Sequence, residues 1–299
     1  MSSNLPWVTA CVPAYRASQY LRGSVLSLLN QTHQRLRVVV INDGDPDPPW
    51  AVLADIHDPR LLRFDLALNK GPYFAAAVAL EATPDALLLM QDADDLSLPH
   101  RLESLLRLMQ HYGSGSAVSA LGQFSDHPQD GTVLDRPLYS SAPRGFPWSE
   151  LGSRIPHHGL FDVRVLKELG GYFGGFHFGY DELLTNLILL TGTVSYTPEP
   201  LYWRRRRQDS LTRSPLTGMK SMRRQRMRQE MQDIYRLAYR DYQAYVSRRV
   251  TRDHFIRSVR ARALAKQSAE DGVLIRDLAS SLRMAMSKQA SFVAVRPRW

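Results

Sequence analysis

The sequence is almost free of cysteine: Cys11 is the only one among its 299 residues. No disulfide can therefore form within one chain, and a cysteine-rich metal site is excluded. Long hydrophobic runs are missing as well, since no apolar stretch approaches the roughly 18 residues of a membrane-spanning helix. The N-terminus also lacks the basic segment followed by an apolar one that marks a secretory signal. We therefore expect a cytoplasmic protein without a transmembrane anchor.

Acidic residues are scarce in the C-terminal third. Residues 204–299 contain 24 Lys and Arg against 8 Asp and Glu, whereas residues 1–203 contain 14 against 21. A basic segment of this kind indicates contact with diphosphate, an anionic membrane surface, nucleic acid or an acidic protein, or else a solvated face. Because no nucleic-acid-binding motif accompanies the charge, we do not expect nucleic acid, and peripheral membrane or protein contact stays open.

Strand-like and helical patterns alternate along the first 120 residues. Short apolar runs predict buried strands, and apolar residues at spacings of three and four predict helices between them. This alternation is typical of an α/β fold with a mostly parallel sheet that helices cover on both faces. The expected strands are residues 7–13, 36–41, 61–66, 86–90, 117–124 and 193–196, and the expected helices are residues 18–31, 72–82, 163–169 and 181–190 and one that starts at Pro99.

The character of the sequence changes near residue 217, where long helix-compatible stretches rich in arginine begin. We therefore divide the chain into an α/β domain at residues 1–215 and a basic, mainly helical extension at residues 216–299. Apolar side chains at helical spacing in the extension predict a face that packs on the α/β domain. They are Met219, Met222, Met227, Met231, Ile234, Tyr235, Leu237 and Tyr239.

Three polar clusters follow expected strands, at Pro13-Ala14-Tyr15, Asn42–Asp45 and Asp92–Asp95. Ligands bind beyond the carboxyl ends of the strands in open α/β sheets, so these clusters predict one shared site. The three carboxylates of the last cluster would repel one another without a cation between them, and oxygen ligands favour Mg²⁺ or Mn²⁺. The alternative is an acidic turn ahead of the next helix.

Two further aspartates have both a structural and a functional interpretation. Asp43 can accept hydrogen bonds from a base or a ribose, or it can simply stabilise the turn in which it lies. Asp181 opens a helix after a glycine- and aromatic-rich stretch, where an aspartate commonly caps the helix. In an apolar pocket its pKa would rise, and it could then act as the general base that deprotonates an acceptor.

Cationic groups follow in the second half of the chain. Arginines in a run at Arg204–Arg207 could stabilise the charge on a diphosphate leaving group, or they could be a solvated strand end. His157 and His158 are candidates for an acceptor or metal site, although histidines outside a recognisable cluster are more often structural.

Taken in order, these segments resemble the family 2 glycosyltransferases, a large inverting group with the GT-A fold. The resemblance implies a nucleotide-diphospho-sugar transferase fold with a Rossmann-like mixed sheet, followed here by the helical extension. It covers about residues 7–213. The matching stretches are TACVPAYRASQYLRGSVLSLLNQT, LRVVVINDGD, NKGPYFAAAVAL, LLLMQDADDLSLPHRLESLL, HHGLFDVRVLKELGGY, GYDELLTNLILLTG and PLYWRRRRQDSLT.

The resemblance also implies a role for each matching residue. Asp181 corresponds to the family's general base, and Asp94 or Asp95 to the residue that holds the divalent cation. Asp43 is expected to contact the base, which is usually uracil in this family. The residues expected to bind the nucleotide sugar are Pro13, Ala14, Tyr15, Asp43, Asp92, Ala93, Asp94, Arg204 and Arg207, and those expected near the acceptor are His157, His158 and Tyr180.

The sequence departs from the family pattern at three positions. Ala76 and Ala77 stand where an Arg-Asn pair is frequent, which removes a usual phosphate or base contact. Tyr180 replaces the glutamate of the Glu-Asp pair, a residue that often contacts the acceptor. These departures predict altered contacts with the donor and an unusual acceptor preference.

The function that the resemblance implies is metal-dependent, inverting transfer of a sugar from a nucleoside diphosphate, with UDP expected. The acceptor would be a hydroxyl or other nucleophile on a glycan, peptide, lipid or small metabolite. One alternative is a catalytically degenerate family member that serves as a binding or scaffold module through its basic tail. Another is a nucleotidyltransferase, but PAYRASQY after the first strand lacks the glycine-rich basic loop that such enzymes use.

Overall fold

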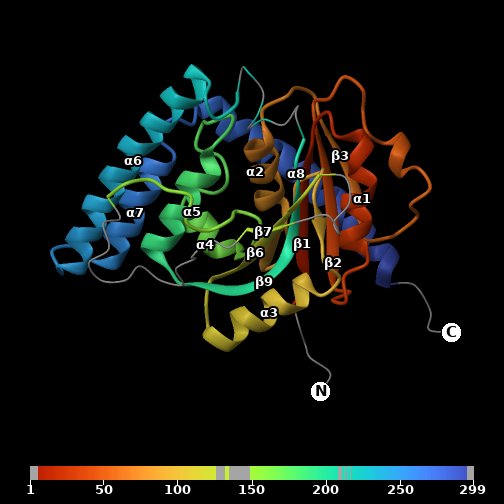
Figure 1. Ribbon diagram of the computed structural model, residues 1–299, viewed down its shortest axis with the longest axis horizontal. Coiled ribbons are helices and arrows are strands. Elements are labelled where there is room, and N and C mark those ends of the chain that lie inside the picture. The colour runs from red at the N-terminus through yellow and green to blue at the C-terminus, as the bar shows by residue number, and fades with distance from the viewer. Residues whose placement is uncertain are drawn as a thin grey trace.

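The computed structural model describes residues 6–125, 132–134, 149–207, 211, 213, 215 and 217–294. One nine-stranded sheet runs through the molecule, in the order β3-β2-β1-β4-β8-β6-β9-β5 with β7 beside β6 (Figure 1). The strands are β1 (Val8–Ala14), β2 (Leu36–Asp43), β3 (Leu61–Leu66), β4 (Leu87–Met90), β5 (Leu96–Ser97), β6 (Ser116–Phe124), β7 (Thr132–Leu134), β8 (Leu160–Asp162) and β9 (Val194–Arg205).

The sheet is parallel at one end and mixed at the other. β1 pairs in parallel with both β2 and β4, and β3 is parallel to β2. β8 is antiparallel to β4 and to β6, whereas β6 and β9 are again parallel. The expected α/β fold is confirmed, with this mixed sheet. The carboxyl ends of β1, β2 and β4 come together at one edge, where the polar clusters follow them.

Eight α-helices and a short 3₁₀-helix lie in the described part of the chain and cover both faces of the sheet. Each face of the sheet carries its own buried hydrophobic cluster, because alternate residues of a strand point to opposite faces. Val8, Ala10 and Val12 of β1 pack with α1 and α3, whereas Cys11 faces α2 and the later helices. The helices are α1 (Ser18–Leu29), α2 (Pro72–Ala82), α3 (Arg101–Tyr112), α4 (Val163–Glu168), α5 (Tyr180–Thr191), α6 (Met222–Val246), α7 (Arg252–Ala263) and α8 (Ala269–Ala294), with the 3₁₀-helix at Ala51–Leu53.

The C-terminal helices share the larger hydrophobic core. Tyr235 of α6, Phe255 of α7 and Leu282 of α8 belong to the same buried cluster as Phe74 of α2. In Figure 1, α6 and α7 lie together beside α5, and α8 runs beside α2. No described helix combines the length and the hydropathy needed to span a bilayer.

The apolar face expected in the extension forms only in part. Met231, Ile234 and Tyr235 are buried against α5, whereas Met219 and Met222 remain 60% and 64% exposed. The prediction was wrong for these two methionines and for Leu237, which is also exposed. Met219 precedes α6 and Met222 is its first residue, while Leu237 lies outside the buried stripe of Met231, Ile234, Tyr235 and Ala238.

Candidate active site

The loop after β4 carries the acidic cluster and rests on a buried arginine. Arg101 of α3 is fully buried and donates hydrogen bonds to the Met90 carbonyl (3.0 Å), Gln91 Oε1 (2.8 Å) and Ser97 Oγ (2.7 Å). Its guanidinium also lies 4.6 Å from the ring centre of Tyr202. These contacts fix the backbone on both sides of residues 92–95, so the loop has one defined position at the sheet edge.

Asp95 ties this loop to β9. Its two carboxylate oxygens accept hydrogen bonds from the Tyr202 hydroxyl and the Arg205 backbone N–H, both at 2.7 Å, and the residue is 2% exposed. Burial, with the neighbouring charges of Asp92 and Asp94, raises the pKa of Asp95 well above its ordinary value. Both oxygens of this expected metal ligand are therefore already engaged within the protein.

Asp94 faces the arginine run. Its carboxylate lies 3.1 Å from Nε of Arg207. Burial and the charge of Asp92 raise the pKa of Asp94, although Arg207 opposes this shift. For Arg204, burial lowers the pKa, but the carboxylates of Asp92 and Asp95 outweigh burial and raise it. The guanidinium therefore stays cationic beside the acidic loop.

Asp92 contacts both histidines of the His157-His158 pair. Nε2 of His158 lies 2.9 Å from Asp92 Oδ2, and Nε2 of His157 lies 3.9 Å from Oδ1. Burial opposes ionisation of Asp92, yet the nearby histidines outweigh it and lower its pKa well below the usual range. Burial and the neighbouring His157 lower the pKa of His158 to about 3, so this ring is neutral at physiological pH.

His157 continues the cluster to the start of α5. Its Nδ1 lies 3.2 Å from Asp181 Oδ2, and the Tyr73 hydroxyl of α2 donates a hydrogen bond to Asp181 Oδ1. Burial alone would lower the pKa of His157, but the carboxylates of Asp181 and Asp92 raise it to about 10. A histidine cation thus joins the expected donor-binding aspartate to the expected base.

The pKa that we expected for Asp181 is wrong in direction. Burial does raise it, but the His157 cation and the hydrogen bonds from His157 and Tyr73 outweigh burial and lower it. Burial raises a carboxylate pKa, whereas a nearby cation and hydrogen bonds to the charged form lower it, and here the second effect is larger. Asp181 does not cap α5 either, since the N-cap position is Gly179 and Asp181 lies in the first turn.

The two clusters after β1 and β2 differ in accessibility. Tyr15 is 37% exposed, while Ala14 is buried and Pro13 half-buried at the sheet edge. Asp43 is 2% exposed, and its oxygens accept hydrogen bonds from the backbone N–H groups of Lys70 and Gly71 at 2.9 Å. Burial raises the pKa of Asp43 to about 6 against these hydrogen bonds. Its visible role is to hold the turn that starts α2.

Arginines from the end of β9 close one side of the site. Arg205 lies over the rings of Tyr20 and Phe124, at 4.9 and 4.5 Å from their centres, and Arg207 lies 5.2 Å from the ring centre of Tyr20. Stacked guanidinium groups lose little conformational freedom when an anion binds. This side of the site is therefore suited to a diphosphate.

Two groups of side chains have the spacing of a metal site. The ligand atoms of Asp92, Asp94 and Asp95 lie within 4.8 Å of one another, and so do those of Asp92, His157 and His158. The first group offers only oxygens, which suit Mg²⁺ or Mn²⁺. Asp95 is buried, whereas Asp92 and Asp94 are partly exposed, so these two are the members that fit a divalent cation best.

The family departures lie inside the core. Ala76 and Ala77 of α2 are 0% and 6% exposed, and the Tyr180 side chain is fully buried, with its ring stacked on Phe176. The structure therefore does not bring Tyr180 to a surface that an acceptor could reach. The Tyr180 ring instead packs against the loop that precedes α5.

Sequence reasoning missed three residues of this site: Tyr73, Arg101 and Tyr202. Tyr73 lies in a helix of small residues and Arg101 in an amphipathic helix, and neither pattern signals a site. Tyr202 lies two residues before the arginine run, separated from it by Trp203, so its position near a predicted site was the one available clue.

Comparisons with known proteins identify the family to which the chain belongs. The model of the family described as "Glycosyl transferase family 2" matches residues 9–170. A Haemophilus influenzae protein named "Uncharacterized glycosyltransferase" is 32% identical over 108 residues, which cover 36% of this chain and 43% of that protein. A Bacillus subtilis protein named "Putative teichuronic acid biosynthesis glycosyltransferase TuaG" is 29% identical over 47% of this chain and 55% of its own length.

Solved structures are similar over most of the chain. S. aureus TarS residues 1–349 in complex with UDP has a TM-score of 0.55 at 14% identity, covering 94% of this chain and 91% of that one. The same S. aureus protein has been solved in complex with UDP-GlcNAc, with a TM-score of 0.55 at 13% identity over 94% and 92%. At such low identity the similarity establishes the GT-A fold alone.

Proposed function

Since this chain belongs to glycosyltransferase family 2, we propose that it transfers a sugar from a nucleoside diphosphate, with UDP as the expected nucleotide, to an acceptor nucleophile. The observation that carries the proposal is the line of charged groups from Asp92 through His157 to Asp181. It joins the donor edge of the sheet to the start of α5. The UDP and UDP-GlcNAc complexes of the similar S. aureus protein support the choice of nucleotide.

We assign the general-base role to Asp181. Its lowered pKa keeps the carboxylate ionised at neutral pH, as a base must be before it accepts a proton. The acceptor oxygen attacks the anomeric carbon while the bond from that carbon to the diphosphate breaks, and the acceptor proton passes to Asp181. One displacement of this kind inverts the anomeric configuration. Tyr73 and His157 hold the carboxylate in position, so the base is oriented before the acceptor arrives.

The donor side has its own charges. We propose that Asp92 and Asp94 would hold a divalent cation, and that Arg204 and Arg207 bind the diphosphate. The cation, when bound, would neutralise charge on the leaving group. Asp95 positions the loop through Tyr202 rather than binding the ligand. The pocket for the base of the nucleotide would lie at Tyr15, beside the backbone of β1.

Residues 1–215 would then carry the catalytic groups, and residues 216–299 would complete the core and shape the acceptor side. The Bacillus subtilis relative named after teichuronic acid biosynthesis supports a glycan acceptor.

The test compares Asp181→Asn with the wild type, using Asp253→Asn as the matched control. Asp253 lies in the first turn of α7, as Asp181 does in α5, but is exposed and outside the site. We expect Asp181→Asn to lower sugar transfer at least about 100-fold, the usual contribution of a general base, without weakening UDP binding measured by calorimetry. A chelator should lower transfer in the wild type, and Mn²⁺ should restore it. Transfer at the wild-type rate by Asp181→Asn would remove the base assignment, and failure of the wild type to bind UDP with Mn²⁺ would favour the scaffold alternative.

A further inference from the structure

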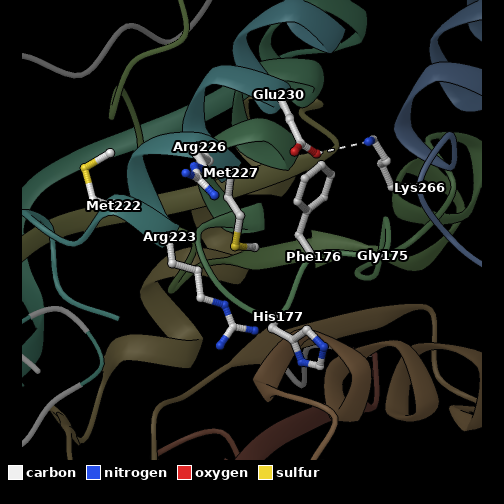
Figure 2. Close-up of a pocket in the computed structure, with 9 residues that line it drawn as sticks. All are labelled: Gly175, Phe176, His177, Met222, Arg223, Arg226, Met227, Glu230 and Lys266. Carbon is white, nitrogen blue, oxygen red and sulfur yellow. Dashed lines mark ion pairs between the residues drawn. The ribbon is translucent and has the colours of Figure 1, made fainter. Parts of the chain in front are cut away.

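A cavity of about 460 Å³ lies outside the acidic cluster, between the loop before α5 and the C-terminal helices (Figure 2). Loop residues Gly175, Phe176 and His177 form one side of the cavity. The first turns of α6 form another side, and Lys266, between α7 and α8, closes the third. None of these residues has a role in the transfer chemistry proposed above.

The cavity is positively charged. Arg223 and Arg226 lie three residues apart on α6, and no carboxylate pairs with either of them among the described residues. Glu230 contributes the one carboxylate of the lining, but it pairs with Lys266 at 3.1 Å, as the dashed line in Figure 2 shows. Two arginine charges therefore remain for a ligand. Guanidinium groups suit carboxylates and phosphates because their parallel N–H groups match two oxygens.

The wall between these charges is apolar. Phe176 and Met227 line the cavity beside the arginines, and Met222 is 64% exposed at its rim. Specific small-molecule sites typically combine an apolar wall with a few polar groups that fix orientation. A ligand with a ring face and an attached oxyanion fits this combination, and an acidic sugar has both.

The cavity is linked to the proposed base through a short packed segment. His177 precedes Asp181 by four residues, so their backbones are at most roughly 14 Å apart. The Phe176 ring stacks on Tyr180 with centres 6.2 Å apart, and Tyr180 meets Tyr73 edge to face at 6.1 Å. Tyr73 in turn donates its hydroxyl hydrogen bond to Asp181. One rigid wall therefore serves both the cavity and the base.

We propose that this cavity binds an oxyanion, either a carboxylate or a phosphate, on the glycan acceptor. Arg223 and Arg226 bind the anion, the Phe176 and Met227 wall covers the sugar ring, and a neighbouring sugar presents its hydroxyl to Asp181. The inference rests on the proposed transferase function and adds the acceptor class. It also assigns a purpose to part of the basic extension.

The experiment measures binding of three matched oligosaccharides to the full chain by calorimetry. Their terminal residue is glucuronate, glucose 6-phosphate or neutral glucose. The test variant is Arg223→Gln with Arg226→Gln. The control variant, Arg240→Gln with Arg257→Gln, removes the same charge from exposed positions of α6 and α7 that do not line the cavity. UDP binding is measured on every preparation.

We expect the wild type and the control variant to bind at least one acidic oligosaccharide at least tenfold more tightly than the neutral one, as expected for charge-assisted hydrogen bonds. The Arg223 and Arg226 variant should lose this preference and keep its UDP affinity. Equal affinity of the wild type for all three ligands would overturn the inference, and so would an equal loss in the control variant. Binding to anionic phosphatidylglycerol vesicles, without any preference among the oligosaccharides, would overturn it in favour of a membrane surface. Failure of the transferase proposal can be told apart from failure of this inference. In that case the wild type would not bind UDP.

Discussion

Replacing Arg101 by methionine tests whether the acidic loop depends on the buried guanidinium beneath it. Methionine has a similar length and fits an apolar gap, so the change removes the charge and the three hydrogen bonds with little change in volume. The Met90 carbonyl and Gln91 Oε1 then lose a buried donor. The matched control is Arg107→Met on the same helix, where the side chain is 73% exposed and pairs with Glu103.

The expected loss follows from the contacts of Arg101. Three hydrogen bonds from a charged donor contribute roughly 1.5–3 kcal/mol each, or about 4–9 kcal/mol together. Burial offsets part of this, since it lowers the pKa of Arg101 to about 10. From the ordinary arginine value, that decrease corresponds to roughly 3 kcal/mol. The net loss of unfolding free energy is therefore about 1–6 kcal/mol, with ~3 kcal/mol as the central value.

Thermal unfolding followed by circular dichroism measures this loss. For a chain of this size, ~3 kcal/mol should lower Tm by about 6 °C, whereas Arg107→Met should change it by ~1 °C or less. UDP affinity with Mn²⁺ should also fall in the folded Arg101 variant, because the loop with Asp92 and Asp94 loses its support. A variant with unchanged Tm and unchanged UDP affinity would show that the loop holds its position without Arg101, and it would refute this reasoning.

Two other predictions concern the base and the core. In His157→Gln the cation beside Asp181 is gone, so the pKa of that carboxylate should rise and the acidic limb of the pH–rate profile should move to higher pH. Because Asp181 also loses a contact that positions it, transfer near neutrality should be about tenfold slower; a limb that stays in place would contradict the pairing. In Gly174→Ala the new Cβ would overlap the Ala263 carbonyl of α7. We expect thermal unfolding to show a loss of roughly 1–3 kcal/mol, whereas Gly192→Ala, whose Cβ meets only ordinary contacts, should change stability little; equal effects would mean that α7 does not pack tightly there.

Much of the fold could be predicted from periodicity alone. The expected strand at residues 61–66 and the expected helix at residues 72–82 agree with β3 and α2 at both ends. Strand β9 was underestimated, because only residues 193–196 have a strand-like pattern, whereas the strand continues through Pro198 and Pro200 to Arg205. Its partner β6 supplies the hydrogen bonds that the local sequence does not signal.

The site was predictable in part, since strand-end aspartates and the helix-opening Asp181 follow from spacing and family resemblance. Spacing carries no information about which side chains meet across the fold. The contacts of Asp181 with His157 and Tyr73 join α5 to α2 and to the segment before β8. These long-range contacts reverse the direction of the expected pKa shift.

The sequence by itself therefore determined the alternation of strands and helices, the sheet edge at which the polar clusters gather, and the identity of the acidic cluster. Those features depend on neighbours along the chain, which the sequence contains directly. The tertiary structure alone decided that Asp95 and Asp43 are engaged by the protein, that Asp181 lies beside a cation, and that α6 forms a charged cavity next to the base. These depend on groups distant in sequence, whose proximity is set by packing of the whole chain around its two hydrophobic clusters.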